Sequence, residues 1–390
     1  MWLSDVRLVL PDRTLERASL RIEGGRITEL REAPVPHADL HGAGLTAIPG
    51  IVDLHGDMLE REIEPRPGAA FPVEMSLFEL DKRLAAAGVT TAYAAISFSE
   101  HRANHLRSEE RAKEIVEAVG AWRGSLLTDF RIHARFEITN PRAAPVLKNL
   151  IERGLVDLVS LNDHTPGQGQ YRDLEQFIHY VSTWQGKTRG EVEANVRERM
   201  ARSLDAPPSW ATIAEVTALT LEAGFCVASH DDDSPEKVAL VHSVGASLSE
   251  FPVTLEAARS ARDAGMRVIM GAPNALRGGS HSGNLSAIAA LGAGALDILA
   301  SDYYPAAMLQ AALCLHRDHA LPLHRAINLI SLNPANAVGL DDCGSLELGK
   351  LANLVLLDHT DHWRVAATLR EGRVVYWAGH PVLRHGAVPA

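Results

Sequence analysis

The sequence predicts an α/β protein: a TIM-like (β/α)8 barrel with a small β-sandwich domain built from both chain ends. In the middle of the chain, eight apolar, β-rich runs alternate with helix-patterned stretches, which is typical of βα units around a parallel sheet. At both ends, short runs of alternating apolar and polar residues are separated by turn residues. The 390 residues suffice for a barrel of roughly 250 residues and a second, smaller domain.

The two chain ends share the pattern of small antiparallel strands. Near the start, the alternating runs are 6–10, 18–22 and 26–30. Near the end, the runs are 352–357 and 373–376, punctuated by Gly349 and Gly372. We therefore expect residues 1–47 and 343–390 to form one composite β-sandwich domain, and residues 48–342 to form the barrel.

The barrel itself is predicted from the order of its elements. The runs predicted as its strands are 47–54, 89–96, 131–138, 155–161, 225–229, 246–250, 266–271 and 296–300. Residues 75–87 have apolar side chains near helical spacing and stop at Gly88, so we expect a helix there. The stretch 165–210 is polar and too long for a simple βα loop, so we expect it to be partly helical and to form a lid.

Composition and charge narrow the classes of function. The formal net charge of −11 argues against a general nucleic-acid binder, and an anionic substrate would need local basic groups. No apolar run is long and uncharged enough to cross a bilayer, and the start lacks a secretory pattern, so we expect a cytoplasmic protein without a membrane partner. The three cysteines form no Cys-x-x-Cys pair, which argues against a thiolate zinc site. The sequence leaves the oligomeric state open, a homo-oligomer included.

The ends of the predicted strands carry residues that bind metals. In a TIM barrel the functional side chains follow the carboxyl ends of the strands. We choose candidate ligands at the ends of five of the eight runs, and these residues are His55, Asp57, Glu137, His164, His230 and Asp302. Any one of them could be a loop histidine or a helix N-cap. Together they indicate a site for zinc, manganese or iron, with enough donors for two ions.

Several segments resemble those of a known family. Residues 48–57, IPGIVDLHGD, resemble the first-strand motif of the amidohydrolase superfamily, with His-x-Asp in place of the usual His-x-His. Residues 333–337 and 349–355 resemble its C-terminal signature. A narrower resemblance, to the α-D-ribose 1-methylphosphonate 5-triphosphate diphosphatase family of the carbon–phosphorus lyase pathway, is carried by RPG at 66–68, DHTPGQ at 163–168, SHDD at 229–232, SEFP at 249–252, GAPN at 271–274, RGGSHSGN at 277–284 and SDYYP at 301–305.

This resemblance implies a diphosphatase in phosphonate metabolism. The family hydrolyses a ribose 5-triphosphate to the 5-phosphate and pyrophosphate, so the implied partner is a small phosphorylated sugar. The implied cofactor is two divalent metal ions, zinc or else manganese or iron, and Asp302 is the implied acceptor of the proton from the attacking water. The implied metal ligands are His55, Asp57, Glu137, His164, His230 and Asp302.

Two features depart from the superfamily pattern. None of the predicted strand ends offers a lysine for carboxylation, so Glu137 is our candidate for a carboxylate that bridges the metals. In addition, His164 and His230 follow the fourth and fifth predicted strands, whereas the superfamily usually takes its two single histidines from the fifth and sixth.

Basic and hydroxyl groups that could grip a triphosphate lie in two segments. The glycine-rich stretch 277–284 offers a guanidinium, hydroxyls, an imidazole and close backbone approach, in Arg277, Ser280, His281 and Ser282. Arg66, flanked by two prolines, is a second candidate. Both segments could instead be plain surface loops. The alternative functions are a deaminase or deacetylase of the same fold, and a catalytically dead scaffold.

Overall fold

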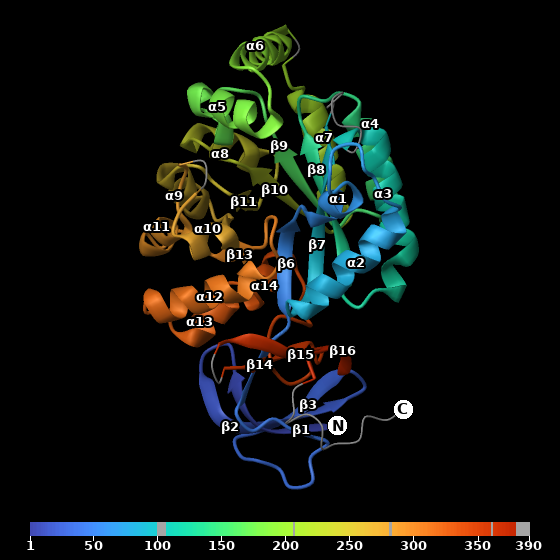
Figure 1. Cartoon of the computed structure of the whole chain (residues 1–390), viewed down its shortest axis with the longest axis vertical. Helices are drawn as coiled ribbons and strands as arrows, with labels where there is room; N and C mark the ends of the chain where they lie inside the picture. The colour runs from blue at the N-terminus through green and yellow to red at the C-terminus, as the bar shows by residue number, and fades with distance from the viewer. Residues whose placement is uncertain (100–106, 206, 281–282, 360–361, 380–390) are drawn as a thin grey trace.

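The computed structural model describes residues 1–99, 107–205, 207–280, 283–359 and 362–379. Its strands form two sheets, a parallel barrel in the middle of the chain and a mixed sheet made from both chain ends. In Figure 1 the terminal sheet lies below the barrel, and helices surround the barrel strands. The predicted fold class is confirmed at this level.

The barrel strands follow one another around the sheet in chain order, and every neighbouring pair is parallel. They are β6 (Ile51–Gly56), β7 (Val89–Phe98), β8 (Asp129–Glu137), β9 (Leu158–Asn162), β10 (Cys226–His230), β11 (Leu248–Glu250), β12 (Arg267–Gly271) and β13 (Ile298–Ala300). Each of the eight predicted runs overlaps one of these strands. The strand count is therefore right: His164 follows the fourth barrel strand, β9, and His230 ends the fifth, β10.

The first predicted strand, 47–54, is wrong as a single element. Its first part belongs to β5 (Leu45–Pro49), which pairs with the terminal sheet, and its second part to β6. Gly50 separates them. A Cβ atom at Gly50 would lie 2.2 Å from Thr90 Oγ1, so only glycine lets the chain pass this close from one sheet to the other. The sequence hides this break because the residues on both sides of Gly50, 47–49 and 51–52, are apolar.

Both chain ends contribute to the terminal sheet, as predicted. The N-terminal strands are β1 (Trp2–Val9), β2 (Thr14–Glu23), β3 (Arg26–Arg31) and β4 (Leu40–His41), and the C-terminal strands are β14 (Leu354–Asp358), β15 (Arg364–Arg370) and β16 (Arg373–Trp377). The order is β16-β15-β14-β5-β1-β2-β3, with β4 beside β1. The antiparallel pairing of β14 with β5 joins the two ends of the chain. A separate apolar cluster, which includes Leu8, Leu20 and Leu354, forms the core of this sheet.

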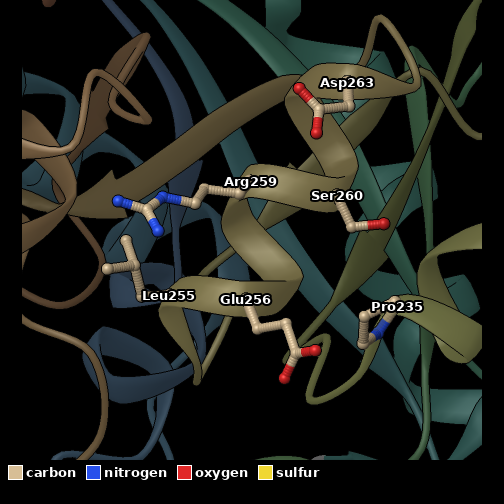
Figure 2. Close-up of a pocket in the computed structure, with 6 residues that line it drawn as sticks. All are labelled: Pro235, Leu255, Glu256, Arg259, Ser260 and Asp263. Carbon is tan, nitrogen blue, oxygen red and sulfur yellow. The ribbon is translucent and has the colours of Figure 1, made fainter.

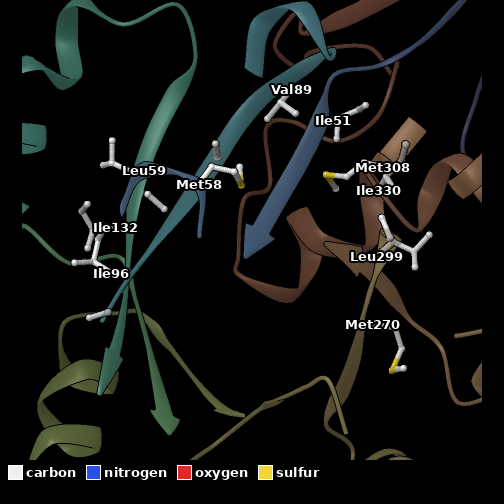
Figure 3. Close-up of a cluster of buried hydrophobic side chains, with 14 of the residues drawn as sticks. Ile51, Met58, Leu59, Val89, Ile96, Ile132, Met270, Leu299, Met308 and Ile330 are labelled. Atoms are coloured by element: carbon white, nitrogen blue, oxygen red, sulfur yellow. The ribbon is translucent and has the colours of Figure 1, made fainter. Parts of the chain in front are cut away.

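Helices cover the outer surface of the barrel. They are α1 (Met58–Ile63), α2 (Val73–Ala86), α3 (Glu109–Trp122), α4 (Ala143–Glu152), α7 (Trp210–Glu222), α8 (Pro235–Ser243), α9 (Leu255–Asp263), α10 (Ala272–Arg277), α11 (Ala287–Gly292), α12 (Ala307–Asp318), α13 (Leu323–Asn328) and α14 (Leu332–Ala337). The predicted helix 75–87 is α2. Figure 3 shows strand residues such as Ile96 and Leu299 beside Leu59 of α1 and Met308 of α12, within the main core. No helix in the described part of the chain could span a membrane.

The predicted lid is a helical hairpin made of α5 (Leu174–Gln185) and α6 (Arg189–Asp205). It extends from the top of the barrel in Figure 1. Its helices have a small core of their own, formed by Phe177, Ile178, Val192 and Val196. The stretch 165–210 was predicted to be partly helical, and two helices form most of it. A few apolar residues on the facing sides of the two helices suffice to pack them together.

Candidate metal centre

The alternation of side chains along the strands places polar groups at the mouth of the barrel. On β8, Ile132, Ala134 and Phe136 pack into the main core outside the barrel. The residues between them therefore face the interior, since successive side chains of a strand point to opposite faces. The lower interior is filled by a separate apolar cluster that includes Leu54, Leu158, Ala228, Leu248 and Ile298. The candidate ligands lie above this apolar floor, at the carboxyl ends of the strands.

One group of possible ligands consists of His55, His230 and Glu250. Their ligand atoms lie within 4.8 Å of one another, and all three residues are buried. Glu250 Oε2 is 3.3 Å from His55 Nδ1, whereas Glu250 Oε1 has no hydrogen-bond partner among the described residues. A buried carboxylate oxygen without a partner is costly. A bound cation would remove that cost.

A second group consists of His164, His230 and Asp231, so that His230 belongs to both groups. His164 Nδ1 lies 2.6 Å from Glu137 Oε2, and the His164 amide donates to Glu137 Oε1 at 3.0 Å. Glu137 therefore holds the proton on Nδ1 and leaves the Nε2 lone pair for a ligand. Burial alone would raise the pKa of Glu137, but the charge and hydrogen bonds of His164 outweigh burial and lower it.

Asp57 and Asp302 meet where the barrel closes. The Asp57 amide donates to the Asp302 carbonyl oxygen at 2.8 Å, and the Asp302 amide donates to the His55 carbonyl oxygen at 2.9 Å. The Asp57 Oδ1 atom is buried and has no partner in the part of the chain that the structure describes. Burial, followed by the charge of Asp57, raises the pKa of Asp302 to about 7.

Two of these strand ends hold non-glycine residues in the left-handed region. Asp231 has φ 55° and Asp302 has φ 56°. This conformation is uncommon for side chains other than glycine and asparagine-like residues, and it concentrates at functional sites. Asp231 directly follows β10 and Asp302 is the second residue after β13, so this conformation sets the direction in which the chain leaves each strand.

The donor set fits divalent transition-metal ions. Imidazole nitrogens and carboxylate oxygens from separate strands converge on one mouth, which is the ligand chemistry of zinc, manganese and iron. Among the described residues, two of the buried carboxylate oxygens without hydrogen-bond partners, Asp57 Oδ1 and Glu250 Oε1, belong to these candidate ligands. The carboxylate oxygens and the imidazole nitrogens could both coordinate such cations.

Comparison with known proteins agrees with this architecture. Residues 199–377 match the model of the amidohydrolase family. The α-D-ribose 1-methylphosphonate 5-triphosphate diphosphatase of Escherichia coli is 35% identical over 383 residues, which cover 96% of this chain and 100% of that one. The chain belongs to the amidohydrolase family. Because this family is hydrolytic, the chain is a hydrolase.

Solved amidohydrolase-like structures share the fold at low sequence identity. The N-acetyl-D-glucosamine-6-phosphate deacetylase of Mycobacterium smegmatis is 18% identical with a TM-score of 0.63, and covers 96% of this chain and 100% of its own. The β-aspartyl dipeptidase of Fervidobacterium islandicum is 14% identical with a TM-score of 0.65, and covers 97% of this chain and 96% of its own. These neighbours establish the barrel and the terminal sheet, not the substrate.

The candidate metal centre includes two acids that the sequence analysis did not choose. Glu250 and Asp231 take part in the two ligand groups. The signal for Glu250 was the alternation on β11, where Leu248 faces the barrel interior two residues earlier. Of the predicted ligands, His55, His164 and His230 lie in these groups, Asp57 and Asp302 meet beside them, and Glu137 contacts His164.

The predicted substrate residues that the structure describes, Arg66, Arg277 and Ser280, are not members of either ligand group. Arg66 is exposed in a turn where its carbonyl accepts the Ala69 amide, and Arg277 is exposed at the end of α10. Neither arginine forms an ion pair within the described ranges. Ser280 is half-buried, and His281 and Ser282 lie outside the described residues. Their roles therefore stay predictions.

A pocket on the outer surface is separate from this centre. It lies between α8 and α9 and is lined by Pro235, Leu255, Glu256, Arg259, Ser260 and Asp263 (Figure 2). None of its residues belongs to either ligand group. We therefore place the chemistry at the barrel mouth.

Proposed function

We propose that this hydrolase cleaves a ribose 5-triphosphate to the sugar 5-phosphate and pyrophosphate in phosphonate catabolism. The proposed substrate is α-D-ribose 1-methylphosphonate 5-triphosphate or a close analogue. The observation that carries the proposal is the 35% identity to a diphosphatase of that substrate, which extends over 96% of this chain and the whole of that relative. The cluster of ligands at the barrel mouth supports the same chemistry.

We further propose that the centre holds two divalent ions, zinc or else manganese or iron. The residues that would hold them are the predicted set, joined by two acids from the structure: His55, Asp57, Glu137, His164, His230, Asp302, Glu250 and Asp231. Divalent ions bound there would lower the pKa of water and neutralise charge on phosphoryl oxygens.

The protein groups have separate tasks in this reaction. Asp302 accepts the proton of the attacking water at a carboxylate oxygen. Glu137 fixes the tautomer of His164, so that Nε2 and not Nδ1 faces the centre. We place the attack at the α-phosphorus, because pyrophosphate leaving as a unit spreads the developing charge over two phosphoryl groups.

Hydrolysis in oxygen-18 water tests the reaction. The metal-loaded protein should place the label on the sugar 5-phosphate and leave pyrophosphate unlabelled, with no diphosphate-sugar intermediate visible by phosphorus NMR. Label in pyrophosphate, or orthophosphate as the first product, would overturn attack at the α-phosphorus. If the protein does not hydrolyse the triphosphate but releases ammonia from a nucleobase or acetate from an N-acyl sugar, it is an amide-type hydrolase and not a diphosphatase.

A further inference from the structure

The geometry points to Arg135 as the residue that binds a phosphoryl group of the substrate inside the metal centre. Arg135 lies on β8, two residues before Glu137, and was not among the residues that the sequence singled out. The inference rests on the proposed function, because it takes the substrate to be a phosphate compound. It adds a binding group that is buried in the barrel mouth, in contrast to the exposed Arg66 and Arg277.

The alternation on β8 directs Arg135 into the barrel. Its neighbours Ala134 and Phe136 pack outward into the main core, so the guanidinium lies on the same face as Glu137. Arg135 Nη2 is 3.4 Å from His164 Nε2, which is a ligand atom of the second group.

Among the described residues, the guanidinium has no anionic partner. Arg135 is only 8% exposed, yet no described carboxylate lies within 4.0 Å of it, and its Nε has no hydrogen-bond partner. Other arginines of the described chain that approach buried acids are paired, such as Arg123 with Asp157 at 2.6 Å and Arg107 with Glu60 at 2.8 Å. A buried arginine keeps its proton, so an unpaired one is costly unless an anion arrives from outside.

Loading of the centre would release the one contact that Arg135 makes through Nη2. A cation on His164 Nε2 takes the lone pair to which Arg135 Nη2 now donates. The Nη2 donor would then join Nε, which has no partner among the described residues, in being available to an anion. A planar fork of this kind matches two oxygens of a phosphoryl group, and it would bind the phosphoryl group at the position of attack.

Inorganic phosphate is the probe for this inference, titrated calorimetrically into the metal-loaded protein. R135M removes the charge and keeps most of the side-chain volume, and it should weaken phosphate binding by about tenfold or more. R135K keeps the charge but loses the fork, and it should bind phosphate more weakly than wild type and more tightly than R135M. Metal content should stay unchanged in both variants. R111M, which removes an arginine paired with Glu114 on α3 outside the barrel, should bind phosphate as wild type does.

The outcomes separate a binding role from a structural one. Wild-type phosphate affinity in R135M or R135K, with the metal retained, would overturn the inference. If the substitutions change only metal affinity or thermal stability, Arg135 merely neutralises the acids of the metal-free centre. That result would also overturn the inference. If R135M does not fold, R135K decides the question. The proposed function is tested separately: it fails if wild type does not hydrolyse the triphosphate. The phosphate titration does not depend on that result, because it measures only binding of phosphate.

Discussion

Asp302 is a buried acid whose protonation couples the centre to stability. Its pKa is raised from 3.8 to about 7 in the folded protein, by burial and then by Asp57. In the metal-free protein, the folded state therefore binds more protons between these values, and stability falls as the pH rises from about 4 to about 7. Above this window the loss is complete.

Asp302→Asn should reverse this loss, because it removes the charge that burial disfavours. With a chelator present, the variant should be more stable than wild type at pH 8, by up to about 4 kcal/mol, and nearly equal to it at pH 4. Denaturant unfolding at the two pH values measures the difference. An equal effect at both values would mean that the carboxyl of Asp302 is not protonated in the neutral range.

Arg277 is exposed at the end of α10, where it can reach an anion without being part of the centre. Arg277→Ala should raise KM for the triphosphate by about tenfold, while kcat and metal content change little, because a contact to a remote phosphate binds ground state and transition state alike. Arg325→Ala, on α13 beside the terminal sheet, is the matched control. Unchanged kinetics in both variants would make 277–284 an ordinary surface loop.

At the scale of single elements, the end of β10 connects both groups of ligands. His230 belongs to each of them, so His230→Ala should lose most of the bound metal and the activity with it. The fold should persist, because the ends of barrel strands contribute little to the core. Metal analysis and circular dichroism measure the two effects, and His324→Ala on α13 is the control. A global loss of structure would show that His230 is needed for folding.

The α5–α6 hairpin has its own small core, so its stability should be separable from that of the barrel. Phe177→Ala should cost the hairpin about 3 kcal/mol and speed amide exchange in α5 and α6, with the main thermal transition almost unchanged. Leu147→Ala, in the main core, should lower that transition instead. A large drop for Phe177→Ala as well would mean that hairpin and barrel unfold together.

At the scale of the whole molecule, the candidate ligands come from strands around the entire barrel, from β6 to β13. Bound metal should therefore resist opening of the barrel anywhere along its circumference. Removal of metal by a chelator should destabilise the protein by roughly 3 kcal/mol if the free ion stood at about one hundred times its Kd. Calorimetry before and after chelation, and after adding zinc back, measures the change. An unchanged transition would exclude tight metal binding to the folded state.

Part of this architecture was determined by the sequence alone. The eight strands are visible in local composition, because each is a short apolar run bounded by turn residues. The histidines and acids at their ends follow from the rule that barrel function lies after the strands. Helix α2 and the helical character of 165–210 follow from spacing and length.

Only the tertiary structure decided which of these residues meet. The division of 47–54 at Gly50 depends on the close approach of Thr90, 40 positions away in the chain. Asp57 and Asp302 become neighbours only because β6 and β13 close the barrel. Glu250 and Arg135 resemble ordinary strand residues until the alternation of β11 and β8 is fixed relative to the barrel interior. Local sequence patterns indicate secondary-structure propensity and the period of the side chains. These contacts depend instead on closure of the barrel and on the register between strands, which no single segment determines.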